Sequence, residues 1–256
     1  MTQETLIVWT SALATSTLSG FLGMGGGILL MLIFLSILPI TDAMILHGIV
    51  QFVANTTRAV THQKNIWWTS VLWYGVGAIV AATSLLFIQW SPEKRLVYLL
   101  SGVLPLIQFL PTKRQLFDIT SKQSAVACGA IMTIGQVTAG ATGPLLDAFF
   151  NQYDRSRFGI IATKAATQTI AHASKILYFL TLSAVLDTAG QPRINLGHER
   201  TLITALGAAV MAIIGTKFGT IILEKITDTR FARLNRQIII ILCAYSFFQA
   251  FQQKKN

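Results

Sequence analysis

The chain has 256 residues, of which 53% are hydrophobic and only 12% charged, whereas soluble domains carry about 25% charged residues. Its apolar residues form long segments without a charged face, which excludes an ordinary soluble domain and indicates an integral membrane protein. The formal net charge is +10, and the basic residues lie mainly in short loops. The sequence contains no nucleic-acid-binding motif, so we expect these residues to contact anionic lipid headgroups. Cys128 and Cys243 lie far apart in apolar segments, so no disulfide framework is expected.

The first apolar segment, residues 6–38, contains the run GFLGMGGG at residues 20–27. Each glycine in a helix costs on the order of 1 kcal/mol relative to alanine, so five glycines in this run predict a helix break. The segment lacks a basic start, carries Glu4 there and ends without a cleavage site, so we do not expect a signal peptide. After it we expect a helix with a polar stripe at 43–62 and two plain spans at 67–89 and 96–111.

A basic linker, residues 112–122, precedes the second half of the chain. This half begins with another apolar segment, 124–150, which is interrupted by TAGATGP at 138–144. Glycine and proline again predict a break. A second polar-striped helix, a polar loop and two plain spans are then expected at 158–182, 187–200, 201–223 and 236–252.

The two halves align without gaps at an offset of 117 residues, which pairs Gly26 with Gly143, Gln51 with Gln168 and Arg58 with Lys175. We therefore predict an all-α membrane protein of about eight hydrophobic segments in two four-segment repeats. The repeats would be residues 1–111 and 123–256. If all eight segments cross the membrane, the basic residues divide evenly between its sides. If both broken segments are re-entrant, the repeats are inverted and one side carries the excess of Lys and Arg, which favours this arrangement.

Each striped helix carries polar residues at helical spacing along one narrow face. The stripes are His47, Gln51, Asn55, Arg58 and His62 in the first repeat, and Lys164, Gln168, His172 and Lys175 in the second. Neither stripe contains an Asp or Glu, and an unpaired cation in a membrane interior is costly, so the pattern favours an anionic substrate. The alternatives are hydrogen bonds between helices and basic side chains that extend to the headgroups.

Other chemistry has less support in the sequence. The histidines form no HxxxH or HExxH motif and have no cysteine partner, so a metal site is not expected and no cofactor is implied. No set of nucleophile, base and acid indicates an enzyme. Asp147 and Glu224 could serve proton coupling, although exposure at the membrane interface explains both more simply. His47 or His172 could also titrate, because imidazole ionises near neutral pH.

These motifs resemble the TauE/SafE family of bacterial anion permeases. The resemblance rests on the two glycine motifs, on HGIVQFVANTTR (47–58), on ATKAATQTIAHASKILYF (162–179) and on IGTKFGTIIL (214–223). It covers nearly the whole chain and implies a carrier in the bacterial cytoplasmic (inner) membrane for sulfite, sulfoacetate or other organosulfonates, with many members acting as exporters. The chain departs from the triple glycine of many members at Thr142 and Pro144.

The expected function is a secondary transporter with its substrate between the two breaks. The candidate binding residues are Gly25, Gly26, Gly27, His47, Gln51, Asn55, Arg58, Thr142, Gly143, Lys164, Gln168, His172 and Lys175. The helix starts would present N–H groups to the anion, and the side chains would donate hydrogen bonds or positive charge. An anion channel on the same scaffold and a membrane assembly subunit are the alternatives. The chain could also assemble as a homodimer.

Overall fold

The computed structural model describes residues 2–22, 25–109, 118–150, 157–185, 199–225 and 228–253. These residues contain helices and no strand, which confirms the all-α prediction. The α-helices are α1 (Gln3–Leu22), α2 (Gly25–Ile37), α3 (Ile40–Thr61), α4 (Trp68–Ile88), α5 (Lys94–Val103), α6 (Lys122–Ala139), α7 (Gly143–Phe150), α8 (Arg157–Val185), α9 (Glu199–Lys225) and α10 (Asp228–Gln252). Two short 3₁₀ helices, η1 (Gln63–Asn65) and η2 (Leu104–Phe109), follow α3 and α5.

The first glycine-rich segment forms a helical hairpin. α1 ends at Leu22 and α2 begins at Gly25, so the predicted break falls between them, while Gly23 and Met24 lie outside the described residues. α2 packs back along α1 so closely that a methyl group on Gly26 would lie 2.1 Å from the carbonyl oxygen of Thr15. Glycine at this position therefore allows the two helices to touch through their backbones.

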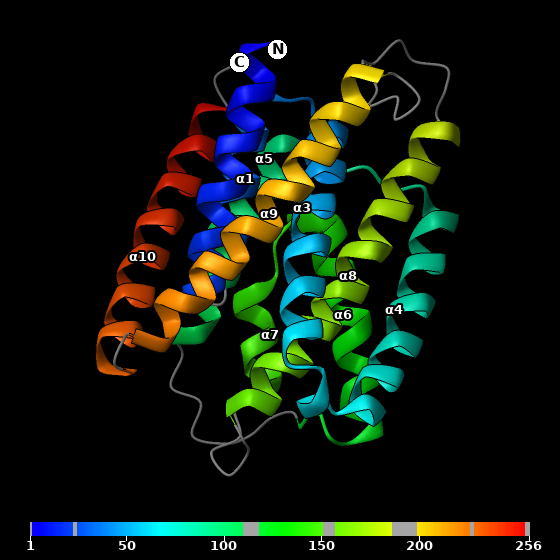
Figure 1. The fold of residues 1–256 in the computed structure, drawn as a ribbon. Coiled ribbons are helices and arrows are strands. Elements are labelled where there is room, and N and C mark those ends of the chain that lie inside the picture. Colours follow the sequence, from blue (N-terminus) through cyan, green and yellow to red (C-terminus); the bar gives the residue numbers. More distant parts are fainter. Residues whose placement is uncertain are drawn as a thin grey trace.

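The second glycine-rich segment forms a hairpin that starts from the opposite end of the molecule. α6 and α7 occupy the lower part of Figure 1, whereas α1 begins at its upper end beside the N-terminus. α6 ends at Ala139, and Gly140 follows with a φ of 74°, in the left-handed region that favours glycine. The predicted break in 138–144 is thus present, and α7 starts at Gly143.

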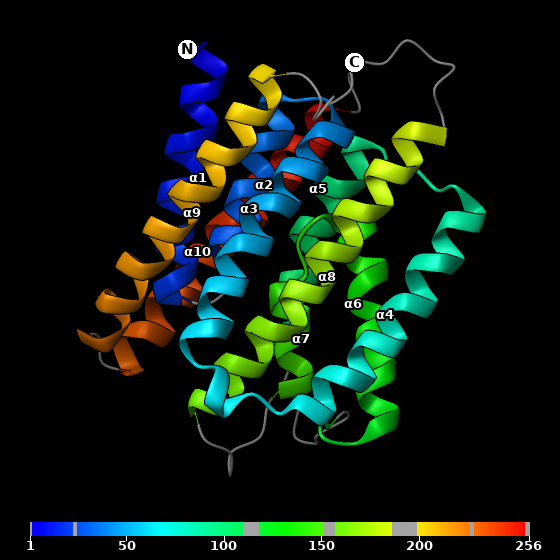
Figure 2. The same ribbon diagram turned by 45° about the vertical axis from the view of Figure 1, so that its right-hand side comes forward.

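The remaining long helices run between the two ends of the molecule, some in one direction and some in the other (Figures 1 and 2). α3 and α9 descend in the view of Figure 1, whereas α4, α8 and α10 ascend. Each hairpin packs its first helix against a helix of the other half of the chain, α1 against α9 and α6 against α4. Glycines make both contacts close: a methyl group on Gly77 would lie 1.9 Å from the carbonyl oxygen of Val126, and one on Gly20 2.8 Å from that of Thr216.

The main apolar core surrounds α2 and α3 and includes residues of α8, among them the fully buried Phe34, Met44 and Phe179. A second core joins α4 to α6 and α7, and Cys128 lies in it. Both cysteines are buried and free, as their apolar sequence context predicts. The cores therefore hold the two hairpins against the striped helices α3 and α8.

Two of the described helices are long and apolar enough to cross a membrane when length and hydropathy alone are considered. They are Trp68–Ile88 and Thr201–Ile222. The striped helices carry polar side chains along one face and α2 has only 13 residues, so they fall outside that measure. The layout of eight membrane segments therefore stays a prediction.

Candidate functional site

The two polar stripes face each other where α3 and α8 cross. The helices run in opposite directions (Figure 2), so the first stripe residue of α3, His47, lies beside the last one of α8, Lys175. Further along, the hydroxyl groups of Thr56 and Thr169 lie 3.5 Å apart. Burial of both stripes in one interface follows from the cost of exposing polar groups to lipid.

A chain of hydrogen bonds through His47 and Lys175 connects the two helix breaks. The ammonium of Lys175 donates to the carbonyl oxygen of Gly140, 2.9 Å away, and lies 2.6 Å from Nδ1 of His47. Nε2 of His47 lies 2.9 Å from the carbonyl oxygen of Gly27, which can only accept. Nε2 therefore carries the hydrogen and Nδ1 accepts from Lys175, so the ring is neutral. Both side chains are fully buried.

A polar cavity lies between the two breaks and the two stripes. The residues that line it are Ser19, Gly27, Ile28, His47, Gln51, Asn55, Arg58, Gln136, Ala141, Thr142, Gly143, Gln168 and His172. Both halves of the chain contribute, and none of these described lining residues is acidic. The cavity volume is about 30 Å³, which corresponds to about one or two water molecules. A larger occupant requires the surrounding side chains to move.

Arg58 supplies positive charge to the cavity wall. Its guanidinium donates to the carbonyl oxygen of Ser19 at 2.9 Å and to Oδ1 of Asn55 at 3.4 Å. Asn55 in turn donates to the carbonyl oxygen of Gln51 at 2.9 Å. Asn55 therefore positions the guanidinium, with one of its own amide hydrogens already used by the backbone.

Several buried polar atoms of the cavity wall have no hydrogen-bond partner in the described part of the chain. The donors among them are Nε2 of Gln51, Nε of Arg58 and Nε2 of Gln168, and the hydroxyl of Thr142 can act as a donor or an acceptor. Oε1 of Gln136 and Nδ1 of His172 are also buried without a hydrogen-bond partner among the described residues. Buried polar groups are normally paired. An excess of donors beside a cation suits a ligand rich in acceptor oxygens.

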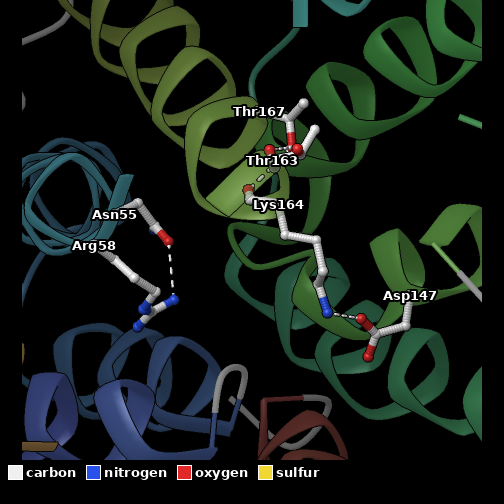
Figure 3. A network of polar contacts seen from close by, with 6 residues as sticks. All are labelled: Asn55, Arg58, Asp147, Thr163, Lys164 and Thr167. Carbon is white, nitrogen blue, oxygen red and sulfur yellow. Dashed lines mark hydrogen bonds and ion pairs between the residues drawn. The ribbon is translucent and has the colours of Figure 1, made fainter. Parts of the chain in front are cut away.

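Lys164 does not line the cavity. Its side chain extends from α8 toward α7 and forms an ion pair with Asp147, away from Asn55 and Arg58 (Figure 3). The sequence predicted that the stripe cations have no acidic partner, and for Lys164 this is wrong, because α7 brings a carboxylate from outside the stripe. Asp147 is likewise in an ion pair and not simply exposed at the membrane interface.

Comparison with known proteins identifies the family of this chain. Residues 8–247 match the model of the family described as sulfite exporter TauE/SafE. The chain belongs to the TauE/SafE family. This family consists of membrane transporters, which agrees with the apolar helices described above. No curated protein and no solved structure matches the chain.

In this TauE/SafE protein, most of the predicted binding residues meet at one place. Nine of them line the cavity: Gly27, His47, Gln51, Asn55, Arg58, Thr142, Gly143, Gln168 and His172. His47 also contacts Lys175. Gly25 and Gly26 are buried in the first hairpin, and Lys175 lies behind His47. His62 lies at the end of α3, its ring 5.7 Å from that of Phe158.

The structure bears differently on Glu224 as a proton-coupling carboxylate and on a metal site formed by the histidines. The side chain of Glu224 lies outside the described residues. Among the described residues, no group of three or more His, Cys, Asp or Glu side chains is placed to hold a metal ion.

Sequence reasoning missed Ser19 and Gln136 in this TauE/SafE site. Both line the cavity from the helix that precedes a break, Ser19 on α1 and Gln136 on α6. Nε2 of Gln136 donates to Oε1 of Gln168 at 3.1 Å. A signal was present, because the two positions are 117 residues apart and so correspond in the internal alignment.

Proposed function

We propose that the chain is a secondary transporter that exports a small sulfur-containing oxyanion, sulfite or an organosulfonate, across the bacterial cytoplasmic membrane. The cavity between the two breaks carries this proposal, since donors from both halves of the chain that have no partner among the described residues surround it beside Arg58. Sulfite and sulfonate groups present acceptor oxygens and negative charge, which such donors bind. The family description supports the substrate class.

The residues have distinct roles in this proposal. Arg58 neutralises the anion, while Gln51, Gln168 and Thr142 donate hydrogen bonds to its oxygens. The starts of α2 and α7 supply backbone N–H groups through Gly27 and Gly143, at helix ends that carry about half a positive charge each. His172 is a further ligand from the second stripe, and Lys175 adds positive charge from behind His47.

We also infer that the two halves, residues 1–111 and 123–256 with a linker at 112–122, are inverted repeats with re-entrant opening hairpins. The first hairpin begins at the upper end of Figure 1 and the second at the lower end. α3 and α8 then run in opposite directions, as do α4 and α9. Two inverted units around a shared site are typical of carriers that alternate access by rocking one unit against the other.

The orientation in the membrane follows from charge. The ends of α3, α7 and α9 lie at the lower end of Figure 1, and the helix ends gathered there include Lys64, Lys122, Arg157, Lys225 and Arg230. The positive-inside bias therefore places this end in the cytoplasm. Export would then carry the anion from the lower to the upper end of the molecule.

Flux measurements in proteoliposomes test the proposal. Purified protein should accelerate sulfite movement, the rate should saturate with sulfite concentration, and sulfate should compete weakly. Flux that rises linearly with concentration and ignores counter-ion gradients would show an anion channel instead. Protein that neither moves nor binds sulfite or any organosulfonate would refute the substrate class.

A further inference from the structure

The cavity contains a pair of glutamine side chains, and this pair fixes what the second half of the chain offers to a ligand. Gln136 is fully buried and Gln168 is 8% exposed. The hydrogen bond from Nε2 of Gln136 to Oε1 of Gln168 uses one donor and one acceptor. It leaves Oε1 of Gln136 and Nε2 of Gln168 without a partner among the residues that the structure describes, and both residues line the cavity.

The outcome does not depend on how the two amides are turned. If both are rotated by half a turn, Gln168 donates to Gln136, and the pair again leaves one amide nitrogen and one carbonyl oxygen unpaired. In either arrangement the glutamine pair therefore presents one donor and one acceptor. The acceptor is a strong group that is costly to bury without a partner.

A fully deprotonated oxyanion cannot satisfy this acceptor. All its oxygens are acceptors, so the amide oxygen of Gln136 or Gln168 would stay unpaired and would face negative charge. An oxyanion that keeps one O–H group can donate to the amide oxygen while its other oxygens accept from Gln51 and Arg58. The donor and acceptor pattern of the cavity thus matches a hydrogen oxyanion.

The charge of the cavity wall points to the same species. Arg58 is the one cationic side chain among the described lining residues. Lys164 is paired with Asp147, and Lys175 is engaged by His47 and by the carbonyl oxygen of Gly140. One guanidinium in direct contact balances one negative charge, the helix starts add only partial charges, and a dianion costs more to bury than a monoanion.

We propose that the site selects the singly protonated oxyanion, a compact monoanion with one O–H group, and that the Gln136–Gln168 pair makes this choice. The inference rests on the proposed function and narrows its substrate class to sulfite, because an organosulfonate monoanion carries no O–H group on its sulfonate. For sulfite, which loses its second proton near neutral pH, the bound species is hydrogensulfite in its O–H form. Affinity for total sulfite therefore falls as the pH rises through that ionisation.

Two probe anions of the same shape test the proposal on the purified full-length protein. Methylphosphonate in mildly acidic buffer and methanesulfonate are both monoanions, and they differ in that only methylphosphonate keeps an O–H group. Isothermal titration should show methylphosphonate binding about tenfold or more tightly, since a site built to bond a hydroxyl rejects the analogue without it. In alkaline buffer methylphosphonate becomes a dianion and should lose this advantage, while methanesulfonate binding stays the same.

Variants of the pair identify the residues responsible. Gln136→Met removes the hydrogen bond to Gln168, so the Gln168 amide can rotate and donate its N–H to either probe. The preference for methylphosphonate over methanesulfonate should then be lost. Gln168→Met is the matched variant, which removes a donor and should weaken both probes. Equal binding of the two probes to the wild type, or a full preference retained by Gln136→Met, would overturn the inference. Failure of the wild type to bind sulfite and both probes would refute the proposed function instead.

Discussion

Arg58, Lys164 and Lys175 are the Arg and Lys residues of the two polar stripes, and each has a different set of contacts. Arg58 lines the cavity, where its Nε has no partner among the described residues. Lys175 is held by the carbonyl oxygen of Gly140 and by His47, so it connects the two halves at their breaks. Lys164 is paired with Asp147. Only Arg58 is therefore placed to contact an anion directly.

The ion pair of Lys164 with Asp147 should contribute to stability. Lys164→Met leaves Asp147 as an unpaired carboxylate in a largely apolar setting, which should cost about 1–3 kcal/mol. This loss of stability is smaller than that expected for a fully buried ion pair, because the side chains of Lys164 and Asp147 are 22% and 28% exposed. Thermal unfolding in detergent should show lower midpoints for Lys164→Met and for Asp147→Leu. The double variant should lose less than the sum of the two, whereas additive losses would show that the pair contributes nothing.

The sequence predicted the residues of the site better than their partners. Helical spacing alone identified Gln51 and Gln168, because a polar stripe in an apolar segment has few explanations. The bond between Lys164 and Asp147 could not be predicted, since it depends on how α7 folds back toward α8. Gln136 was missed because it stands as a single polar residue before a break, with no periodic row to mark it.

At the scale of elements, close helix contacts hold each hairpin in place. α6 packs against α4 through Gly129 and Gly77, and a methyl group on Gly129 would lie 1.9 Å from the carbonyl oxygen of Tyr74. Backbones that touch in this way gain van der Waals contact. In lipid this contact drives helix association, because burying apolar surface between helices gives no hydrophobic gain there. The corresponding contact of α1 with α9 uses Gly20 and Gly219. Small residues were visible in the sequence, but their partner helices were not.

Gly77 and Gly75 offer a matched test of this packing on one helix. Gly77→Ala places a methyl group 1.9 Å from the carbonyl oxygen of Val126, so α4 and α6 must separate. We expect a loss of about 1–3 kcal/mol or more in stability. In Gly75→Ala the nearest atom is Cδ1 of Ile170 at 3.9 Å, so this variant should unfold at the wild-type midpoint or slightly above it. Equal effects of the two variants would contradict the close contact.

At the scale of the whole molecule, the two hairpins begin at opposite ends and bring their breaks to one cavity (Figure 1). The sequence predicted two broken segments but left open whether they span the membrane or re-enter. This choice decides the relation between the halves. With eight full crossings the starts of the two hairpins lie on the same side of the membrane, and with re-entrant hairpins they lie on opposite sides.

Cysteine labelling distinguishes these topologies. Gln3 and Gln123 are exposed residues at the starts of α1 and α6. In a background where the buried Cys128 and Cys243 are replaced by alanine, a membrane-impermeant maleimide should label Gln3→Cys on intact cells. It should label Gln123→Cys only after the cells are opened. Labelling of both positions from the same side would contradict inverted repeats.

The central claim is that one anion binds between the halves, in contact with both. Equilibrium binding of sulfite to the purified protein tests it most directly, with Arg58→Gln and Gln168→Met as variants of the two halves and Arg95→Gln, an exposed position, as the charge-matched control. Loss of a buried hydrogen bond to an anion corresponds to about 1.5–3 kcal/mol, so each cavity variant should weaken affinity by about tenfold or more. Arg95→Gln should bind like the wild type. Unchanged sulfite affinity in both cavity variants would contradict the account.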